Sequence, residues 1–560
     1  MSSEHAAPIP VRIPVPPDFP VTWASPEDEH MMWTHDRMHA PDPVVPLEED
    51  FWARTYGGFS GAAQLYSMPL QARARTINTY VYSAFTPAAP PEEMEALGRR
   101  SQERVREVLG RLETLWKDQW LPEIKSHLAW WHAFDLRAAS GPALVVHLRE
   151  SLARMDRLWA LHFEIVLPVY SAISQFDDFY RDLFGSDGAF SSYKLLQGFD
   201  NKTLETFREM WLLSRKARNI PAVRQVLEER SAGEVMDALG QTAEGRAFQA
   251  DVRRYLAEYG QRADKWGLVD ACWIEDPSPV FQNMQTYIAQ TGRSAMDEQA
   301  GLIAERDRAV AESRERLRGY PQAVVDEFEF LLKAAQFANV LTEDHGFWID
   351  FNATFRVRTV FLEFGRRLAE AGAIDGAASV FYLTLDEVLL LESSLATRHL
   401  HERVAERRAT VERFRKVSPP PALGTDYGPP PDDPLGRSLM KFFGAPPPAS
   451  DTPGMLRGHA GSPGKVRGRA CVISRLEMAG KLKRGDVLVT ETTAPPWTPL
   501  FATAGAIVTD TGGVLSHCAV VAREYAIPAV VGTGRATATI QDGQLLEVDG
   551  DTGVVTIIGD

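Results

Sequence analysis

The sequence TDTGGVLSHCAVVARE, residues 509–524, decides how the C-terminal part of this chain folds. An apolar run, GAIVTD (505–510), leads into it and predicts a strand. The two glycines predict a turn, and Ser516 is suited to cap a helix filled by alanine and valine. The N-terminus of a helix offers free N–H groups and the positive end of a dipole. The pattern therefore predicts a phosphate site that uses Thr511, Gly512, Gly513 and Ser516.

His517 stands at the predicted start of this helix. A neutral imidazole in that place can attack a phosphorus atom and become N-phosphohistidine. The N–H groups and the hydroxyls of Thr511 and Ser516 would then stabilise the phosphoryl oxygens. The alternative for a single histidine on an apolar stripe is a capping or core residue. The glycines and hydroxyls around His517 favour the phosphoryl carrier.

Short β-branched runs surround this stretch and alternate with turns. A small α/β domain over residues 451–560 follows from these runs and the one helix. The runs that predict strands are residues 470–474, 485–491, 505–510, 528–532, 544–550 and 553–559.

The first 417 residues show a helical period instead. From residue 94 to residue 131 the apolar side chains recur at steps of three, four and seven. Similar patterns run through residues 142–175, 203–240, 300–340 and 353–372, whereas strand-like alternation is scarce. Twelve of the 13 tryptophans lie in this part. We expect a large, mostly helical domain whose tryptophans pack in cores or line a pocket for an aromatic ligand.

Residues 418–450 separate the two parts and hold ten of the 37 prolines. Proline fixes φ and donates no backbone hydrogen bond, so we expect neither a helix nor the interior of a sheet here. The segment is predicted to be an extended linker. It is either an inert spacer or a tether on which the C-terminal domain moves.

Composition excludes several classes of protein. The formal net charge of −15 argues against non-specific nucleic-acid binding. No apolar run is long enough to span a membrane, and the N-terminus shows no secretory signal. Cys272, Cys471 and Cys518 form neither a disulfide framework nor a zinc-binding pattern. We expect a cytoplasmic protein with no metal site and no tightly bound cofactor of its own.

Residues 457–556 resemble the swivelling phosphohistidine domain of the phosphoenolpyruvate (PEP)-utilising enzymes. This resemblance implies that His517 carries the phosphoryl group. Leu515 stands where pyruvate–phosphate dikinases usually have threonine, and Cys518 stands where they have a small residue such as alanine. The residues that carry the resemblance are Gly461–Gly464, Gly485–Val489, Gly512, Gly513, Ser516, His517, Ala519, Ala522, Arg523 and Ile527–Gly532.

The helical part resembles the substrate domains of rifampin phosphotransferase and phenylphosphate synthase. Rifampin enzymes have arginine at Thr342 and lysine at Gly346, so the two-subunit phenylphosphate synthase is the better fit. The segments that carry this resemblance are Leu195–Gly198, Asn201–Thr203, Tyr259–Arg262, Trp273–Pro277, Glu343–His345, Gly365–Leu368 and Val380–Glu387.

The resemblance implies a phosphotransferase component. We find no ATP-binding module in the chain, so we expect a separate ATP-grasp subunit to hold ATP and Mg²⁺ and to charge His517. The phosphoryl group would then pass to the hydroxyl of a small aromatic acceptor, a phenol or alcohol, with ATP converted to AMP and phosphate. The alternatives are a non-catalytic phosphocarrier or regulatory protein, a fragment of a rifamycin-type antibiotic phosphotransferase, and an enzyme that uses a pre-made phosphoryl donor.

The acceptor hydroxyl needs a general base within hydrogen-bond reach. His345 is the first candidate, with Glu343 or Asp344 either orienting it or serving instead. Guanidinium groups suit phosphoryl oxygens, which makes Arg262, Arg358 and Arg367 candidates for phosphate binding. The alternatives are solvated or ion-paired arginines and a helix cap.

Overall fold

The computed structural model describes residues 10–185, 190–289, 295–390, 400–428, 434–445 and 452–559. The chain forms two compact units, each built from several segments. The first unit takes residues 1–167, 266–269 and 352–432, and the second takes 168–265, 270–351 and 433–560. A helix, α5 (Gly141–Phe184), runs from one unit into the other at Leu167–Pro168.

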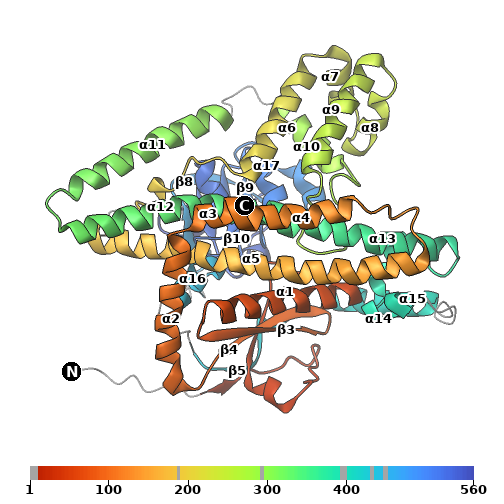
Figure 1. Cartoon of the computed structure of the whole chain (residues 1–560). Coiled ribbons are helices and arrows are strands. Elements are labelled where there is room, and N and C mark those ends of the chain that lie inside the picture. The colour runs from red at the N-terminus through yellow and green to blue at the C-terminus, as the bar shows by residue number, and fades with distance from the viewer. Residues whose placement is uncertain are drawn as a thin grey trace. The chain divides into compact units, whose positions relative to one another are not determined.

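The first unit contains a five-stranded sheet in the order β1-β5-β2-β4-β3. The β3–β4 hairpin turns at Asn78 and Thr79, which both have positive φ, as a tight hairpin turn requires. Helix α1 packs along β3 (Figure 1). The strands of the sheet are β1 (Val11–Arg12), β2 (Met32–His35), β3 (Leu70–Ile77), β4 (Tyr80–Pro87) and β5 (Ala422–Asp426).

This sheet is not among the elements predicted above, where the first 417 residues are expected to form a mostly helical domain. Its β4 strand has five consecutive buried residues, so no alternation marks it. Aromatic side chains fill its core, among them Phe19, Trp33, Tyr80 and Tyr82.

The other elements of the first unit are helical, as the period predicted. They are the 3₁₀ segments η1 (Pro26–His30) and η5 (Ala377–Tyr382), the π-helical segment η2 (Trp116–Trp120), and the helices α1 (Pro46–Leu65), α2 (Pro91–Leu109), α3 (Leu112–Leu115), α4 (Leu121–His132), α13 (Thr354–Glu370), α14 (Leu385–Leu389) and α15 (Leu400–Phe414).

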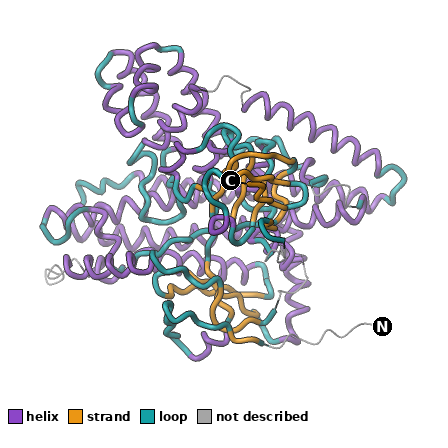
Figure 2. Tube along the Cα trace, turned by 180° about the vertical axis from the view of Figure 1, so that it is seen from behind, coloured by secondary structure: helices purple, strands orange, loops and turns teal. Residues whose placement is uncertain are grey.

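Helices also make up the first part of the second unit. Helices α6 to α10 form an all-helical group with its own apolar core (Figure 2). The segments are η3 (Tyr193–Leu195), α6 (Lys202–Arg218), α7 (Pro221–Glu229), α8 (Ala232–Leu239), α9 (Ala243–Tyr259), α10 (Ser278–Ala289), α11 (Ala295–Arg316), α12 (Gln322–His345), the π-helical segment η4 (Gly346–Ala353), which ends in the first unit, and α16 (Pro434–Phe443).

The C-terminal part of the second unit is an α/β domain around an eight-stranded sheet in the order β6-β13-β12-β8-β9-β10-β11-β7. The central strands β8 to β11 are parallel, and the outer pairs are antiparallel. Its elements are β6 (Met455–Arg457), β7 (His459–Ser462), β8 (Lys465–Val472), η7 (Leu476–Lys481), β9 (Val487–Thr490), η8 (Pro495–Trp497), α17 (Thr498–Phe501), β10 (Ala506–Thr509), α18 (His517–Glu524), β11 (Ala529–Val531), α19 (Ala536–Thr539), β12 (Leu545–Asp549) and β13 (Val554–Gly559).

The predicted fold class is therefore confirmed: a mostly helical chain ends in a small α/β domain. Five of the six predicted strand runs contain a strand, the run 470–474 overlaps the end of β8, and the predicted helix after Ser516 is α18. Valine and alanine side chains of β9, β10 and β11 fill the core of the sheet.

The prediction of an extended linker over residues 418–450 is wrong for two segments, residues 422–426 and 434–443. Strand β5 lies inside the first unit's sheet, between β1 and β2. The strand itself contains no proline, so its N–H groups can form the hydrogen bonds of the sheet. Residues 434–443 form α16, whose Lys441 ammonium binds Asp177 and Asp178 at 2.7 and 2.8 Å. Residues 429–433 and 446–450 lie outside the described residues. The predicted boundaries at 417 and 450 do not coincide with those of the two units, and movement of the C-terminal domain stays a prediction.

Among the helices that the structure describes, none combines the length and the apolar character needed to cross a membrane.

A candidate phosphohistidine site

The loop between β10 and α18 places His517 at the first position of α18. Gly512 has φ +94°, and a Cβ at Gly513 would lie 2.3 Å from the carbonyl oxygen of Lys441, so both positions need glycine. Ser516 is the extended N-cap residue, and its buried Oγ has no hydrogen-bond partner in the described part of the chain. The loop thus presents a free hydroxyl beside the histidine.

The imidazole of His517 contacts a carboxylate from the helical part of the second unit. Its Nδ1 lies 3.1 Å from Oε1 of Glu343, and its side chain is 12% exposed. A carboxylate only accepts, so Nδ1 carries the proton and the lone pair is on Nε2. Nε2 is buried and has no hydrogen-bond partner among the described residues. Nε2, the atom that would attack phosphorus, is therefore not engaged by any described residue.

Glu343 is held in its ionised form. It lies near the end of α12, is 4% exposed, and accepts a hydrogen bond from the hydroxyl of Thr203 at 2.7 Å. Burial by itself raises the pKa of Glu343, but His517, Thr203 and Arg262 together lower that pKa below its ordinary value. A buried anion therefore stays beside the histidine.

The start of α6 lies next to this pair. Asn201 caps the helix by accepting from the N–H of Leu204 at 2.9 Å, and Asp344 accepts from the N–H of Lys202 at 2.7 Å. Burial raises the pKa of Asp344 to about 7. The two adjacent carboxylates of α12 therefore have different partners: Glu343 binds His517, and Asp344 binds the first backbone N–H of α6.

Arg262 is a buried cation with spare donors. It is 1% exposed, and its Nη2 donates to Thr206 Oγ1 at 3.1 Å and to the Lys202 carbonyl at 3.3 Å. Its Nε and Nη1 have no hydrogen-bond partner among the residues that the structure describes. Burial lowers the pKa of Arg262 to about 10, so it stays charged at neutral pH. Two free N–H directions on a buried guanidinium suit an anion.

Aromatic rings surround the two cations of this region. The Lys202 ammonium lies 5.3 Å from the ring centre of Phe347 and 5.7 Å from that of Trp348. The Arg262 guanidinium lies 5.3 and 5.4 Å from the rings of Phe347 and Phe351. Three aromatic side chains of the helical part thus lie beside these two cations.

The structure gives the predicted phosphate loop other hydrogen bonds. The Thr511 hydroxyl donates to the Glu491 carbonyl at 3.0 Å, and the N–H of Gly513 donates to the Phe442 carbonyl of α16 at 2.8 Å. The N–H of Gly513 is thus used for packing α16. Phosphate binding by Thr511, Gly512 and Gly513 stays a prediction, while Ser516 keeps a free hydroxyl.

His345 points away from Glu343, because two residues correspond to about 200° around a helix. Its Nδ1 donates to the Leu341 carbonyl at 2.5 Å, and its Nε2 lies 3.9 Å from a carboxylate oxygen of Asp350. The contact with His517 therefore comes from Glu343. A role of His345 as general base stays a prediction.

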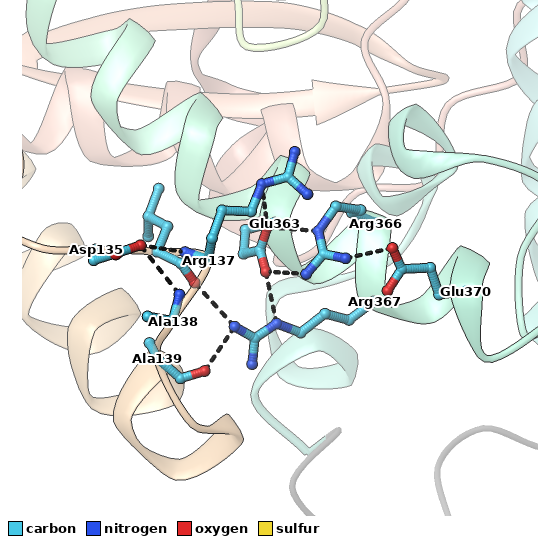
Figure 3. Close-up of polar contacts among 9 residues, drawn as sticks. Asp135, Arg137, Ala138, Ala139, Glu363, Arg366, Arg367 and Glu370 are labelled. Atoms are coloured by element: carbon cyan, nitrogen blue, oxygen red, sulfur yellow. Dashed lines mark hydrogen bonds and ion pairs between the residues drawn. The ribbon is translucent and has the colours of Figure 1, made fainter.

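Arg358 and Arg367 belong to the first unit and bind other groups there. Arg358 donates to the carbonyls of Leu268 and Val269. Arg367 binds Glu363 at 2.7 Å and donates to backbone carbonyls of residues 136 and 139 (Figure 3). These bonds give both side chains a structural role in the first unit. Phosphate binding by Arg358 and Arg367 stays a prediction.

Comparison with known proteins agrees with this geometry. Residues 482–553 match the family model of the PEP-utilising enzyme mobile domain, and residues 162–343 match that of the rifampicin phosphotransferase fourth domain. His517 lies in the first match, and Glu343 is the last residue of the second. The C-terminal domain is therefore a mobile domain of the PEP-utilising enzymes, and the helical part is similar to that of rifampicin phosphotransferases.

Three relatives illustrate the similarity. A chondramide synthase from Chondromyces crocatus is 42% identical over 98% of this chain and 14% of its own length. An uncharacterised phosphotransferase from Bacillus subtilis is 32% identical over 71% of this chain and 47% of its own. A rifampicin phosphotransferase from Streptomyces sp. is 30% identical over 76% of this chain and 48% of its own. The chain thus spans less than half of each of these relatives.

Proposed function

We propose that this chain is the phosphoryl-carrying component of a phosphotransferase. His517 takes a phosphoryl group on Nε2 and passes it to the hydroxyl of a small aromatic acceptor. The observation that carries the proposal is the state of the imidazole, because Nδ1 is fixed by Glu343 while Nε2 is buried and unpartnered. The match of residues 482–553 to the PEP-utilising mobile domain supports it.

In the first step, the lone pair of Nε2 attacks a phosphorus atom of the donor. A P–N bond forms, and the bond from phosphorus to the leaving oxygen breaks. The ring becomes a phosphoimidazolium that keeps its proton on Nδ1, and the Glu343 carboxylate stabilises this positive charge. In this proposal an ATP-grasp partner would hold the donor ATP with Mg²⁺. One phosphoryl group of ATP would pass to Nε2 and a second would pass to a water molecule to give phosphate, so that the nucleotide leaves as AMP.

In the second step, the acceptor oxygen attacks the same phosphorus and the P–N bond breaks. The free Nε and Nη1 of Arg262 stabilise the phosphoryl oxygens. The acceptor's proton passes to a base, and Asp344 suits this role because its pKa is raised to about 7 by burial. A phenol demands less of the base than an alcohol does, since its hydroxyl has a pKa of about 10.

An aromatic acceptor is supported by the rings of Phe347, Trp348 and Phe351 around Lys202 and Arg262. A rifamycin is the second candidate, because the Streptomyces rifampicin phosphotransferase is similar over 76% of this chain. Thr342 and Gly346, where rifampin enzymes have arginine and lysine, favour the smaller acceptor. The three buried cysteines form no disulfide among the described residues, which suits a reducing compartment, so we propose the cytoplasm.

The test combines the chain with ATP, Mg²⁺ and an ATP-grasp partner, followed by a panel of phenols and rifampicin. Intact-protein mass spectrometry should detect an acid-labile adduct of one phosphoryl group, and His517→Ala should lack it. His401→Ala is the matched control, because His401 is an exposed histidine of the first unit. This variant should form the adduct at the wild-type rate.

The outcomes separate the alternatives. A phosphate ester of a phenol supports the proposal, and an ester of rifampicin alone supports the second candidate. An adduct that no acceptor discharges indicates a non-catalytic carrier. An adduct that persists in His517→Ala overturns the assignment of the carrier.

A further inference from the structure

Two adjoining pockets lie in the first unit, and neither is lined by a residue that the proposed function uses. The wider one has a volume of about 490 Å³ and the smaller one about 200 Å³. They share the lining residues Phe134, Leu136 and Thr359, so they lie directly beside each other. Helix α13 supplies one wall, and the end of α4 with the segment after it supplies another. The combined space is of the size that holds small molecules.

The smaller pocket has aromatic walls. Trp131, Phe134, His147 and Phe355 line it. The His147 ring is stacked between two others, with its centre 3.7 Å from that of Phe134 and 4.3 Å from that of Trp130. Burial, with Arg154 nearby, lowers the pKa of His147 to about 4. His147 is therefore neutral at pH 7 and adds a flat surface rather than a charge.

In the wider pocket the positive charges are already compensated. Glu363 binds Arg366 through both oxygens at 2.6 and 2.8 Å and Arg367 at 2.7 Å (Figure 3). The Nε of Arg137 is 3.6 Å from the same carboxylate, and Arg366 also binds Glu370. The Asp135 carboxylate accepts backbone N–H groups of residues 137 and 138.

Arg356, in the smaller pocket, differs from these arginines. Its Nε is buried without a hydrogen-bond partner, and its guanidinium makes no ion pair with any described residue. Its guanidinium lies 5.5 Å from the centre of the Phe355 ring. Burial is the cause of its lowered pKa, with no acidic group opposing the shift. A half-buried cation without an anion is costly, and a bound anion would remove that cost.

We propose that the smaller pocket binds an aromatic carboxylate. The carboxylate pairs with the Arg356 guanidinium, the ring lies among Trp131, Phe134 and Phe355, and the wider pocket admits a substituent on the ring. One uncompensated cation matches one negative charge, and the planar guanidinium fork matches the two oxygens of a carboxylate. This site goes beyond the proposed function and does not depend on His517.

Titration calorimetry with benzoate and its neutral isostere benzamide tests this inference on the whole chain. Wild type should bind benzoate at least tenfold more tightly than benzamide. Arg356→Gln should lose benzoate affinity at least tenfold and keep its affinity for benzamide. Arg137→Gln is the matched control, because it removes the same charge from the wider pocket, and it should bind benzoate as wild type does. His517→Ala should also bind benzoate normally, which separates this test from that of the phosphoryl carrier.

Equal binding of benzoate and benzamide to wild type, or no binding of benzoate at millimolar concentration, overturns the proposal. So does benzoate binding that survives Arg356→Gln. Tighter binding of phenyl phosphate than of benzoate overturns the choice of a carboxylate. If Arg356→Gln does not fold, the comparison of the two ligands on wild type still decides the question.

Discussion

The proposed reactivity of His517 depends on one hydrogen bond that it donates across 174 residues of sequence. Imidazole has two tautomers, and only the one with its proton on Nδ1 leaves Nε2 free to attack phosphorus. Glu343 selects that tautomer because a carboxylate cannot donate. Thr203 in turn holds Glu343 through its other oxygen. The nucleophile, its orienting anion and the hydroxyl that fixes the anion thus form one chain of contacts.

The first prediction concerns Glu343→Gln. An amide can turn its NH₂ toward Nδ1, which would move the proton to Nε2 and block the attack. It also removes the negative charge that stabilises the phosphoimidazolium. We expect phosphorylation of His517 to slow on the order of 10²- to 10⁴-fold, with the fold intact. The rate of the acid-labile adduct measures the effect, and ¹⁵N chemical shifts of the ring report the tautomer.

Glu305→Gln provides the control for this experiment. Glu305 is another carboxylate of the second unit, and it pairs with Lys194 and Gln197 rather than with His517. Its variant should phosphorylate at the wild-type rate. A Glu343→Gln variant that keeps both the wild-type rate and the wild-type tautomer would contradict the orienting role.

At the same scale, the sequence predicts some site residues and misses others. His517 and Ser516 stand out locally, because a glycine turn and a helix cap surround them. Glu343 and Arg262 follow from resemblance to a family. The sequence does not predict Thr203 or Lys202 as site residues, because each contacts the site through residues about 60 to 140 positions away. No local pattern signals such contacts.

Among the elements, α5 is a 44-residue helix that contains Pro168. Proline has no N–H, so the carbonyl of Glu164, four residues earlier, loses its partner within the helix. The hydroxyl of Tyr66 donates to this carbonyl at 2.6 Å. Tyr66 is 4% exposed and follows directly after α1. A side chain just beyond the end of α1 thus satisfies the backbone group that proline leaves free.

Tyr66→Phe should therefore destabilise the protein by about 1–3 kcal/mol, the cost of a buried carbonyl without a partner. In a Pro168→Ala background the alanine N–H can bind the Glu164 carbonyl, so the same substitution should cost less. Urea unfolding of the four proteins of this double-mutant cycle measures the difference. Tyr427→Phe is the control, because the half-exposed Tyr427 also donates to a carbonyl, that of His30.

Equal costs of Tyr66→Phe in the two backgrounds would show that the hydroxyl does not replace the missing N–H. A loss at Tyr427 as large as that at Tyr66 would show that burial does not set the cost.

The elements also differ in how well the sequence predicts them. The strands of the C-terminal sheet are short, β-branched and separated by glycine turns, so period and turn signals agree. The N-terminal sheet lacks these signals, because β5 reaches it from residue 422, more than 330 positions after β4. Proline content marks the neighbourhood of β5 as irregular, and only its pairing with β1 and β2 makes it a strand.

Over the whole molecule, the proposed transfer would require the C-terminal domain to leave its docked position, since donor and acceptor cannot both contact His517 at once. Both ends of α18 are held in the second unit. His517 binds Glu343 at one end, and at the other Glu524 accepts from the N–H of Gly198 at 3.1 Å. Burial raises the pKa of Glu524 to about 7, despite the N–H of Gly198 and the charge of Arg523. The docked state therefore binds a proton that a released, solvated Glu524 would lose.

The sign of the pH effect follows from this difference. Between the ordinary pKa of about 4.3 and the docked value of about 7, docking takes up a proton, so it is strongest at low pH and weakens as pH rises through this window. Glu524→Gln is neutral at every pH and keeps an oxygen that accepts from Gly198. We expect this variant to dock more firmly than wild type above pH 7 and like wild type near pH 5.

Hydrogen exchange of the Gly198 N–H and turnover with the ATP-grasp partner measure this prediction together. Above pH 7, Glu524→Gln should exchange the Gly198 proton more slowly and turn over more slowly, because release of the domain becomes harder. Slower exchange with unchanged turnover would show that release of α18 is not part of the cycle. Unchanged exchange would show that the Glu524 carboxylate does not weaken docking.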